Sequence, residues 1–199
     1  MKINNHYVYS LSEVRTFIED SNHFEAYFKS ESEKFCTKLN PTLSLFLKEK
    51  SLKLNDQNLL RTYLIINTDT LEFIGYFCLK VVNIKLDDNV SNKIKKKISS
   101  DAKKNNEFPA ILITKLARND RYKNEFPGKL IMDYALSIGN RIYKSIALRH
   151  ICVDWYQNEK LKHFYCEECG FKVFQSKVIK NHNDEKESKI LVSAFYKYQ

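Results

Sequence analysis

The sequence has few of the residues that interrupt a chain, and few long apolar runs. Glycine occurs 4 times and proline 3 times among 199 residues, so we ask at each glycine whether the backbone requires it. The longest apolar runs, such as residues 110–113, are too short to span a membrane. The opening MKINNHYVYS lacks the apolar stretch of a secretory signal. We therefore expect a cytoplasmic protein without a membrane segment.

Cysteine is also sparse, with five residues at Cys36, Cys78, Cys152, Cys166 and Cys169. The number is odd, and most of these residues lie inside apolar stretches. This distribution suits buried thiols in a reducing compartment better than a disulfide framework. We predict no disulfides.

The remaining composition is typical of a folded chain with an excess of positive charge. Hydrophobic residues make up 43% and aromatic residues 13% of the sequence, which fits a single domain over residues 1–199 with a real core. The formal charge of +9 attracts anions, and polyanions most strongly. The sign alone does not distinguish nucleic acid from a phosphorylated cofactor.

The spacing of apolar residues indicates both strands and helices. Strands are predicted at residues 6–9, 60–67, 73–85, 110–116, 151–155, 172–178 and 190–196. Helices are predicted after the capping-box pair Ser10 and Glu13, after Asn40 and Pro41, over residues 130–142, and over residues 158–169 with Gly170 as the C-terminal glycine. A hairpin followed by strand, helix, strand, helix, strand, strand implies a mixed sheet with helices on both faces, of the α+β or α/β class.

Residues 87–107 (DDNVSNKIKKKISSDAKKNNE) are polar and rich in lysine. We predict an exposed connection here, partly helical at best. Lys93, Lys95, Lys96 and Lys97 are interpreted as a solvated face. The alternative is that they contact phosphate or RNA.

A charged turn precedes the helix at residues 117–135 (ARNDRYKNEFPGKLIMDYA). The first amides of a helix have no intrahelical partner, and the helix dipole adds about +0.5 charge there, so this entrance could hold a phosphate. Positive charge is supplied by Arg118, Arg121, Lys123 and Lys129. The alternative is that Pro127 and Gly128 merely start a helix.

The segment NEKLKHFYCEECGF at residues 158–171 brings His163, Cys166 and Cys169 close together in sequence. A structural zinc site normally needs four ligands, and a lone C-x-x-C without a second pair is insufficient. His182 is the one further candidate nearby, and it has no partner at ligand spacing. We therefore predict no metal site.

Taken together, two blocks resemble the GNAT superfamily of N-acetyltransferases. FPAILITKLARNDRYKNEFPGKLIMDYAL matches the family's apolar strand, basic loop and helix start, where loop amides bind the pyrophosphate of acetyl-coenzyme A. NEKLKHFYCEECGFKVF matches its helix with a Phe-Tyr pair followed by Gly-Phe, and EFIGYFCLK is similar to its central strands. The resemblance covers roughly residues 60–178. It implies a mixed, mostly antiparallel central sheet of six to seven strands with helices on both faces.

The resemblance implies roles for individual residues. The cofactor-binding positions would be Leu116, Ala117 and Arg118, whose backbone would hold the pantetheine arm, and Lys123, Asn124, Phe126, Gly128 and Lys129 in the pyrophosphate loop. Tyr165, at the Phe-Tyr position, would be the catalytic acid that protonates the departing thiolate. Acetyl-coenzyme A would be a co-substrate, no metal would be needed, and no general base is assigned.

The upstream segment KFCTKLNPTLSLFLKEKSL with RTYLIIN resembles a bacterial branch that includes toxins acetylating the amino group of aminoacyl-tRNA. The resemblance thus implies transfer of acetyl to a primary amine, with tRNA as a candidate acceptor. It leaves open the oligomeric state, a homodimer included, and any antitoxin. Two glycines of the family's loop are replaced, by Asn124 and Phe126. The alternative function is therefore a catalytically weakened GNAT-fold module that binds RNA or protein through its basic surface.

Overall fold

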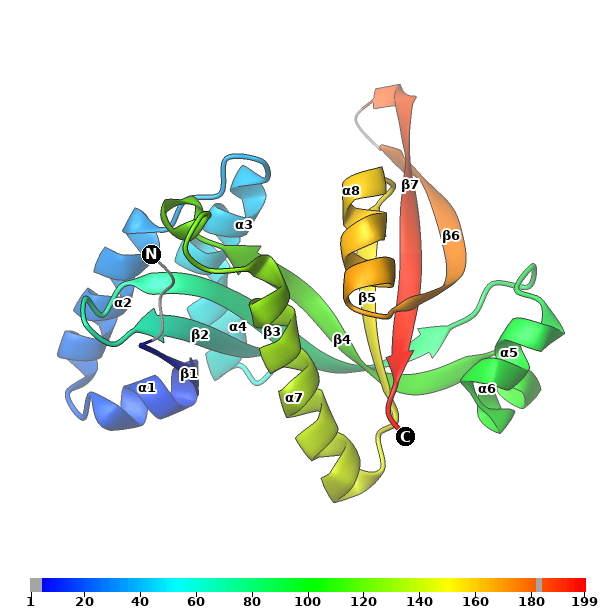
Figure 1. The fold of residues 1–199 in the computed structure, drawn as a ribbon, viewed down its shortest axis with the longest axis horizontal. Coiled ribbons are helices and arrows are strands. Elements are labelled where there is room, and N and C mark those ends of the chain that lie inside the picture. Colours follow the sequence, from blue (N-terminus) through cyan, green and yellow to red (C-terminus); the bar gives the residue numbers. More distant parts are fainter. Residues whose placement is uncertain (1–4, 182–183) are drawn as a thin grey trace. The chain divides into compact units, whose positions relative to one another are not determined.

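Seven strands form one open sheet in the computed structural model, which describes residues 5–181 and 184–199 (Figure 1). The strand order is β1-β2-β3-β4-β5-β7-β6. The pair β4/β5 is parallel, and the pairs β1/β2, β2/β3, β5/β7 and β6/β7 are antiparallel. The strands are β1 (His6–Ser10), β2 (Arg61–Asn67), β3 (Phe73–Lys85), β4 (Glu107–Arg118), β5 (His150–Tyr156), β6 (Lys172–Asn181) and β7 (Asp184–Lys197). This is the mixed, mostly antiparallel sheet that was predicted.

Helices fill most of the connections between strands. They are α1 (Leu11–Phe17), α2 (Ser21–Lys34), α3 (Pro41–Phe46), the π-helical turn η1 (Leu47–Ser51), α4 (Leu52–Asp56), α5 (Asn92–Ile98), α6 (Ser100–Asn105), the 3-10 turn η2 (Asp120–Tyr122), α7 (Gly128–Ile146), α8 (Glu159–Lys162) and the π-helical turn η3 (His163–Glu168). No helix of the described residues is both long enough and apolar enough to cross a membrane.

The chain divides into two compact units. Unit 1 comprises residues 1–80 and 114–135, and unit 2 comprises residues 81–113 and 136–199. The elements β3, β4 and α7 run through both units.

In unit 1 the side chains of the sheet alternate between two packed faces. Leu64 and Ile66 of β2 pack into one core with residues of α1, α2 and η1, including Leu11, Phe24 and Leu47. Successive strand residues point to opposite faces. On the other face the start of α7 packs on β3, where Ile131 lies against Gly75. Helices therefore cover both faces of the sheet in this unit, as predicted.

Several local predictions are confirmed. Ser10 and Glu13 form the capping box of α1, β3 has the predicted bounds, and Gly170 has φ +75, the left-handed conformation expected after a helix. Helix α2 was not anticipated. Asn40 is the N-cap residue of α3, but its side chain makes no capping bond.

The prediction for residues 87–107 was only partly right. Lys93, Lys96 and Lys97 are exposed, as predicted. This connection folds into α5 and α6, and Ile98 and Ala102 are fully buried in the core of unit 2 with Phe108 and Phe195. Lys95 is 7% exposed, and its Nζ donates to the Asn106 Oδ1 atom at 2.7 Å, so it is not part of a solvated face.

The five cysteines are free thiols, as predicted. Cys78, Cys152 and Cys169 are buried, whereas Cys36 is exposed and Cys166 is half-buried. The expectation of mostly buried thiols therefore holds for three of the five.

Candidate active site

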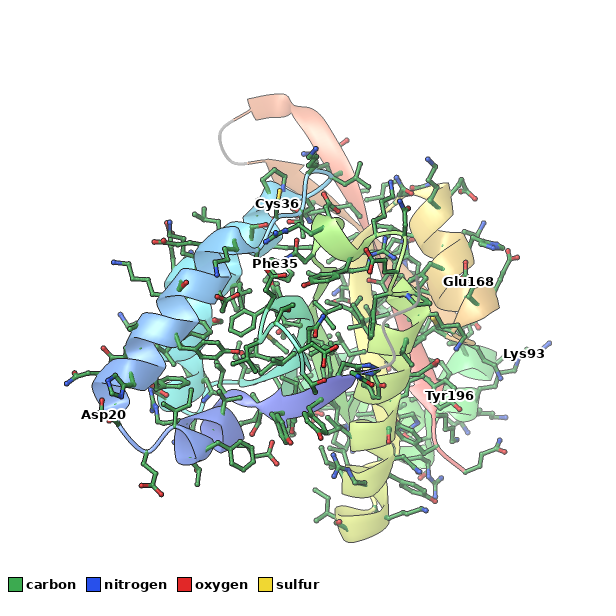
Figure 2. The ribbon with its side chains drawn as sticks, turned by 60° about the vertical axis from the view of Figure 1, so that its left-hand side comes forward. Asp20, Phe35, Cys36, Lys93, Glu168 and Tyr196 are labelled. Atoms are coloured by element: carbon green, nitrogen blue, oxygen red, sulfur yellow. The ribbon has the colours of Figure 1, made fainter. Side chains whose placement is uncertain are left out.

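The loop between β4 and α7 is anchored in unit 1 by the side chain of Asn119, which is 2% exposed. Its Oδ1 atom accepts hydrogen bonds from the amides of Arg121 at 3.2 Å and Cys36 at 3.4 Å, and its Nδ2 atom donates to the Phe73 carbonyl at 3.1 Å. Its own amide donates to the Ile74 carbonyl at 2.8 Å. Asn119 thus ties the loop to β3 and to the residues following α2, where Figure 2 labels Phe35 and Cys36.

Two carboxylates add to this anchoring. The Oδ2 atom of Asp120 accepts from the Lys38 amide at 2.6 Å. Glu72 forms an ion pair with Arg121 at 2.9 Å and accepts a hydrogen bond from the Tyr122 hydroxyl. Asp120 and Glu72 therefore help to fix the conformation of the loop. The ion pair with Glu72 also neutralises Arg121, so less of the positive charge of the loop is uncompensated.

Arg118, at the end of β4, spans the loop. Its Nη1 atom donates to the Phe126 carbonyl at 2.9 Å, and its Nε atom is buried without a partner among the described residues. A buried N–H group without an acceptor is costly. The Nε donor of Arg118 is therefore not used within the described part of the chain.

Phe126 has its ring in the interior, 1% exposed. The ring packs edge-to-face against His6 at a centroid distance of 5.0 Å, and the His6 Nε2 atom lies 2.5 Å from the Tyr134 hydroxyl of α7. Burial lowers the pKa of His6. The Phe126 ring is therefore part of the core, at a position where the family pattern has a glycine.

The outer side of the loop carries amides and cations. Among the described residues, the amides of Asn124 and Gly128 find no acceptor, whereas the amides of residues 119–123, 125 and 126 are bonded within unit 1. Lys123 and Lys129 are exposed. Lys129 pairs with Asp133 at 2.6 Å, and Lys123 forms no ion pair with the described part of the chain. Lys123 and these two amides, close to the start of α7, are the groups with which the loop can meet an anion.

The neighbouring end of β4 offers unpaired backbone. Pairing between β4 and β5 covers only Ile111–Ile113 of β4, yet β4 continues to Arg118. Within the described residues, the β4 edge opposite β3 therefore has no strand partner from Thr114 to Arg118. Backbone groups at such an edge can bond an extended ligand as a strand would.

Gly75 lets α7 approach the sheet at this end. A Cβ atom at Gly75 would lie 2.6 Å from the Ile131 Cδ1 atom and 2.9 Å from the Ala117 carbonyl oxygen. Both distances are shorter than real Cβ contacts. Ile131, in the first turn of α7, is completely buried. The glycine thus sets how closely the start of α7 packs beside the β4 end.

Tyr165 lies in unit 2, in the π-helical turn η3, and is 8% exposed. Its ring packs against Trp155 at 4.9 Å and Phe171 at 6.2 Å between centroids. Burial, with a smaller contribution from Cys169, raises the pKa of Tyr165 to about 12, so the phenol is protonated at neutral pH. The turn is wide because the Cys169 amide donates to the Phe164 carbonyl, five residues back. Such π-turns are frequent at functional sites.

The zinc alternative gains no support. His163 pairs with Glu167 at 2.9 Å and with Glu168 at 3.5 Å. No group of three or more metal-ligating side chains occurs in the described part of the chain. His182 lies outside the described residues.

The predicted site residues fall into two sets. Leu116, Ala117, Arg118, Lys123, Asn124, Phe126, Gly128 and Lys129 lie together in unit 1, and Tyr165 lies in unit 2. Sequence reasoning missed Asn119 and His6. The preference of asparagine for turns and caps could have indicated Asn119, but nothing in the sequence indicates His6.

The comparisons with known proteins give a structural match only. No protein-family model matches the sequence, and no curated protein matches it significantly. A tyrosine-to-phenylalanine mutant of KacT has a TM-score of 0.67 and 19% identity, and the match covers 98% of this chain and 95% of that one. AtaT complexed with acetyl-methionyl-tRNAfMet has a TM-score of 0.67 and 17% identity over 97% and 95% of the two chains.

A mutant of the AtaT toxin, bound to acetyl-CoA and to the C-terminus of the antitoxin AtaR, has a TM-score of 0.62 and 14% identity over 98% and 94% of the two chains. At these identities the likeness concerns the fold. It extends over nearly the whole chain, including segments outside the blocks that carried the sequence resemblance. The chain therefore has the fold of KacT and AtaT, the GNAT fold that the sequence resemblance implied.

Proposed function

We propose that this protein is an N-acetyltransferase that moves acetyl from acetyl-coenzyme A to a primary amine. The observation that carries the proposal is the unpaired β4 edge from Thr114 to Arg118, followed directly by a loop with free amides at Asn124 and Gly128. The fold shared with AtaT, which has been solved with acetyl-CoA, supports it.

The residues of unit 1 fit such a ligand. The amides of Asn124 and Gly128, with the Lys123 ammonium, would bind the pyrophosphate. The backbone of Leu116, Ala117 and Arg118 would bond the pantetheine arm. The unpartnered Arg118 Nε donor is a further group that a bound ligand could satisfy. Phe126 contributes by packing, because its ring is buried and both its amide and its carbonyl are already bonded.

Acetyl-coenzyme A, when bound, supplies an acetyl group activated as a thioester. An N–H of the β4 edge would donate to the carbonyl oxygen as negative charge develops there during attack by the amine. The Tyr165 hydroxyl would hold the proton that the departing thiolate takes. The phenol is protonated at neutral pH, and its raised pKa makes it a weaker acid than an exposed tyrosine. The proton that the amine loses on acylation would pass to solvent.

We further propose aminoacyl-tRNA as the acceptor. The support is the likeness to AtaT, whose structure was solved with acetyl-methionyl-tRNAfMet. The excess of positive charge on this chain suits a polyanionic acceptor.

The first test is calorimetric titration with acetyl-coenzyme A. A dissociation constant of about 1 mM corresponds to a binding free energy of only about −4 kcal/mol. Absence of binding at this ligand concentration would refute the proposal. The second test compares Tyr165→Phe with Tyr156→Phe, a control tyrosine that is 55% exposed. Loss of a general acid lowers turnover by about 10²–10⁴-fold. Acetyl transfer to bulk aminoacylated tRNA should fall in this range for Tyr165→Phe, with unchanged affinity for acetyl-coenzyme A. Equal activity of the two variants would remove Tyr165 from the mechanism.

A weakened binding module remains the second candidate, and the loop itself favours it. Most of the loop amides are bonded within unit 1, and Pro127 has none to offer. This candidate predicts RNA binding without measurable affinity for acetyl-coenzyme A, so the same calorimetric titration distinguishes the two.

A further inference from the structure

Positive charge is concentrated in unit 2. Unit 2 contains 18 lysines and arginines against 11 acidic residues, whereas unit 1 contains 15 against 13. Of the net charge of +9, unit 2 therefore carries +7. The excess is densest on α5 and α6, where the exposed residues Lys93, Lys96, Lys97, Lys103 and Lys104 form what we call the lysine face.

The lysine face is not compensated by carboxylates. None of the ion pairs formed by described residues includes any of its five lysines. Asp101, on α6, is the one acidic residue within the two helices. Figure 2 shows Lys93 extending away from α5.

This arrangement opposes the stability of α5. Lys93 and Lys97 are four residues apart on a seven-residue helix, and like charges at this spacing repel. Lys93 also lies in the first turn, where the helix dipole disfavours a cation. The apolar residues Ile94, Ile98 and Ala102 already secure the packing of α5 and α6. The exposed lysines are thus not needed to hold the two helices in place.

A further cation lies at the C-terminal end of α5. The Lys197 Nζ atom donates to the carbonyls of Lys97 at 3.0 Å and Ile98 at 2.8 Å. Burial, with smaller contributions from Arg149 and Lys172, lowers the pKa of Lys197. Lys197 of β7 thus places one more ammonium group beside the C-terminal end of α5.

We propose that the lysine face of α5 and α6 binds the phosphate backbone of an RNA. This inference rests on the proposed function and adds to it the surface that holds the acceptor. RNA fits better than an acidic protein, because cores of protein interfaces are depleted in lysine and rich in aromatic anchors. None of the exposed large apolar residues of the described chain lies on α5 or α6.

The test measures binding of the full chain to fluorescently labelled bulk tRNA between about 50 and about 300 mM salt, since each neutralised phosphate adds roughly 0.7–0.9 to the slope of log affinity against log salt. The test variant replaces four lysines of the lysine face with glutamine: Lys93, Lys96, Lys103 and Lys104. The matched control replaces four exposed lysines of unit 1: Lys29, Lys50, Lys53 and Lys80.

We expect the slope of the lysine-face variant to fall by about 2–3, as for three to four lost phosphate contacts, while the control keeps the slope of the unmodified protein. Equal slopes for the two variants would overturn the proposal. Polyglutamate that displaces the labelled tRNA as effectively as unlabelled tRNA of equal charge would also overturn the proposal. The lysine face would then be a surface for acidic proteins.

Calorimetry with acetyl-coenzyme A on the same samples separates this inference from the proposed function. None of the substituted lysines belongs to the cofactor site, so the affinity should be the same in all three proteins. If acetyl-coenzyme A binds but the salt slopes are equal, only the RNA surface is refuted. If tRNA binds through the lysine face but acetyl-coenzyme A does not bind, only the acetyltransferase proposal fails.

Discussion

The close packing at Gly75 leads to the sharpest prediction, for Gly75→Ala. The added methyl group would lie 2.6 Å from the Ile131 Cδ1 atom and 2.9 Å from the Ala117 carbonyl oxygen. The side chain can move, but the carbonyl belongs to β4 and cannot. Overpacking of this kind costs about 1–3 kcal/mol, and replacing glycine by alanine within a strand returns about 0.5–1 kcal/mol. With the middle of each range, the net loss of unfolding free energy should be about 1 kcal/mol.

Urea unfolding measures this loss. With an m-value of about 2 kcal/mol per molar, the midpoint should fall by roughly 0.5 M. Because the methyl group would push the start of α7 away from the end of β4, affinity for acetyl-coenzyme A should also fall, by up to about tenfold for a loss of 1.4 kcal/mol. Gly139→Ala is the control for a steric clash elsewhere on α7, because its Cβ atom would meet the Tyr198 hydroxyl within unit 2.

A double variant tests the reasoning itself. Ile131→Val removes the Cδ1 atom that the new methyl group would meet. It costs about 0.5–1.5 kcal/mol alone. The double variant Gly75→Ala, Ile131→Val should therefore be more stable than the sum of the two single effects predicts. Strict additivity, or a Gly75→Ala protein as stable as the parent, would refute the close-packing argument.

Two further predictions concern buried polar groups. Burial lowers the pKa of His150 from 6.5 to about 4, so the unfolded chain binds more protons between these values and acidification destabilises the fold. Lowering the pH from 7 to 4 should cost about 3 kcal/mol through this group, and His150→Phe should flatten that part of the stability profile; an unchanged profile would contradict it. Asn119→Ala leaves the buried Phe73 carbonyl without its donor and the amides of Cys36 and Arg121 without their acceptor, which costs about 1–3 kcal/mol. It should weaken acetyl-coenzyme A binding in calorimetry more than the exposed Asn105→Ala does.

Sequence reasoning succeeded where the signal was local. The capping box at Ser10 and Glu13 and the left-handed Gly170 depend on residues only a few positions apart. They can therefore be predicted without knowledge of the fold. The alternation of apolar and polar residues along the strands is likewise a local signal. The family resemblance then supplied the arrangement of these elements, which the structural match to KacT and AtaT confirmed at the level of the fold.

The remaining features depend on partners distant in sequence. The Asn119 side chain bonds Phe73, 46 residues away, so its role in shaping the loop is visible only in the folded chain. The buried Phe126 ring packs against His6, at the opposite end of unit 1 in sequence. In α5 and α6, the many lysines concealed the apolar residues Ile94, Ile98 and Ala102, which pack into the core of unit 2.

The wide turn at His163–Glu168 also bears on how this chain tolerates changes of length. A π-helical turn contains one residue more than the α-helical turn it replaces. Deleting Cys166 would close the turn and rotate the preceding residues by about 100° relative to Gly170, the angle of one residue in an α-helix. Tyr165 would then leave the side of the helix that packs on Trp155. At this place a single-residue deletion should be more harmful than most substitutions, because the number of residues decides which aromatic side chain points inward.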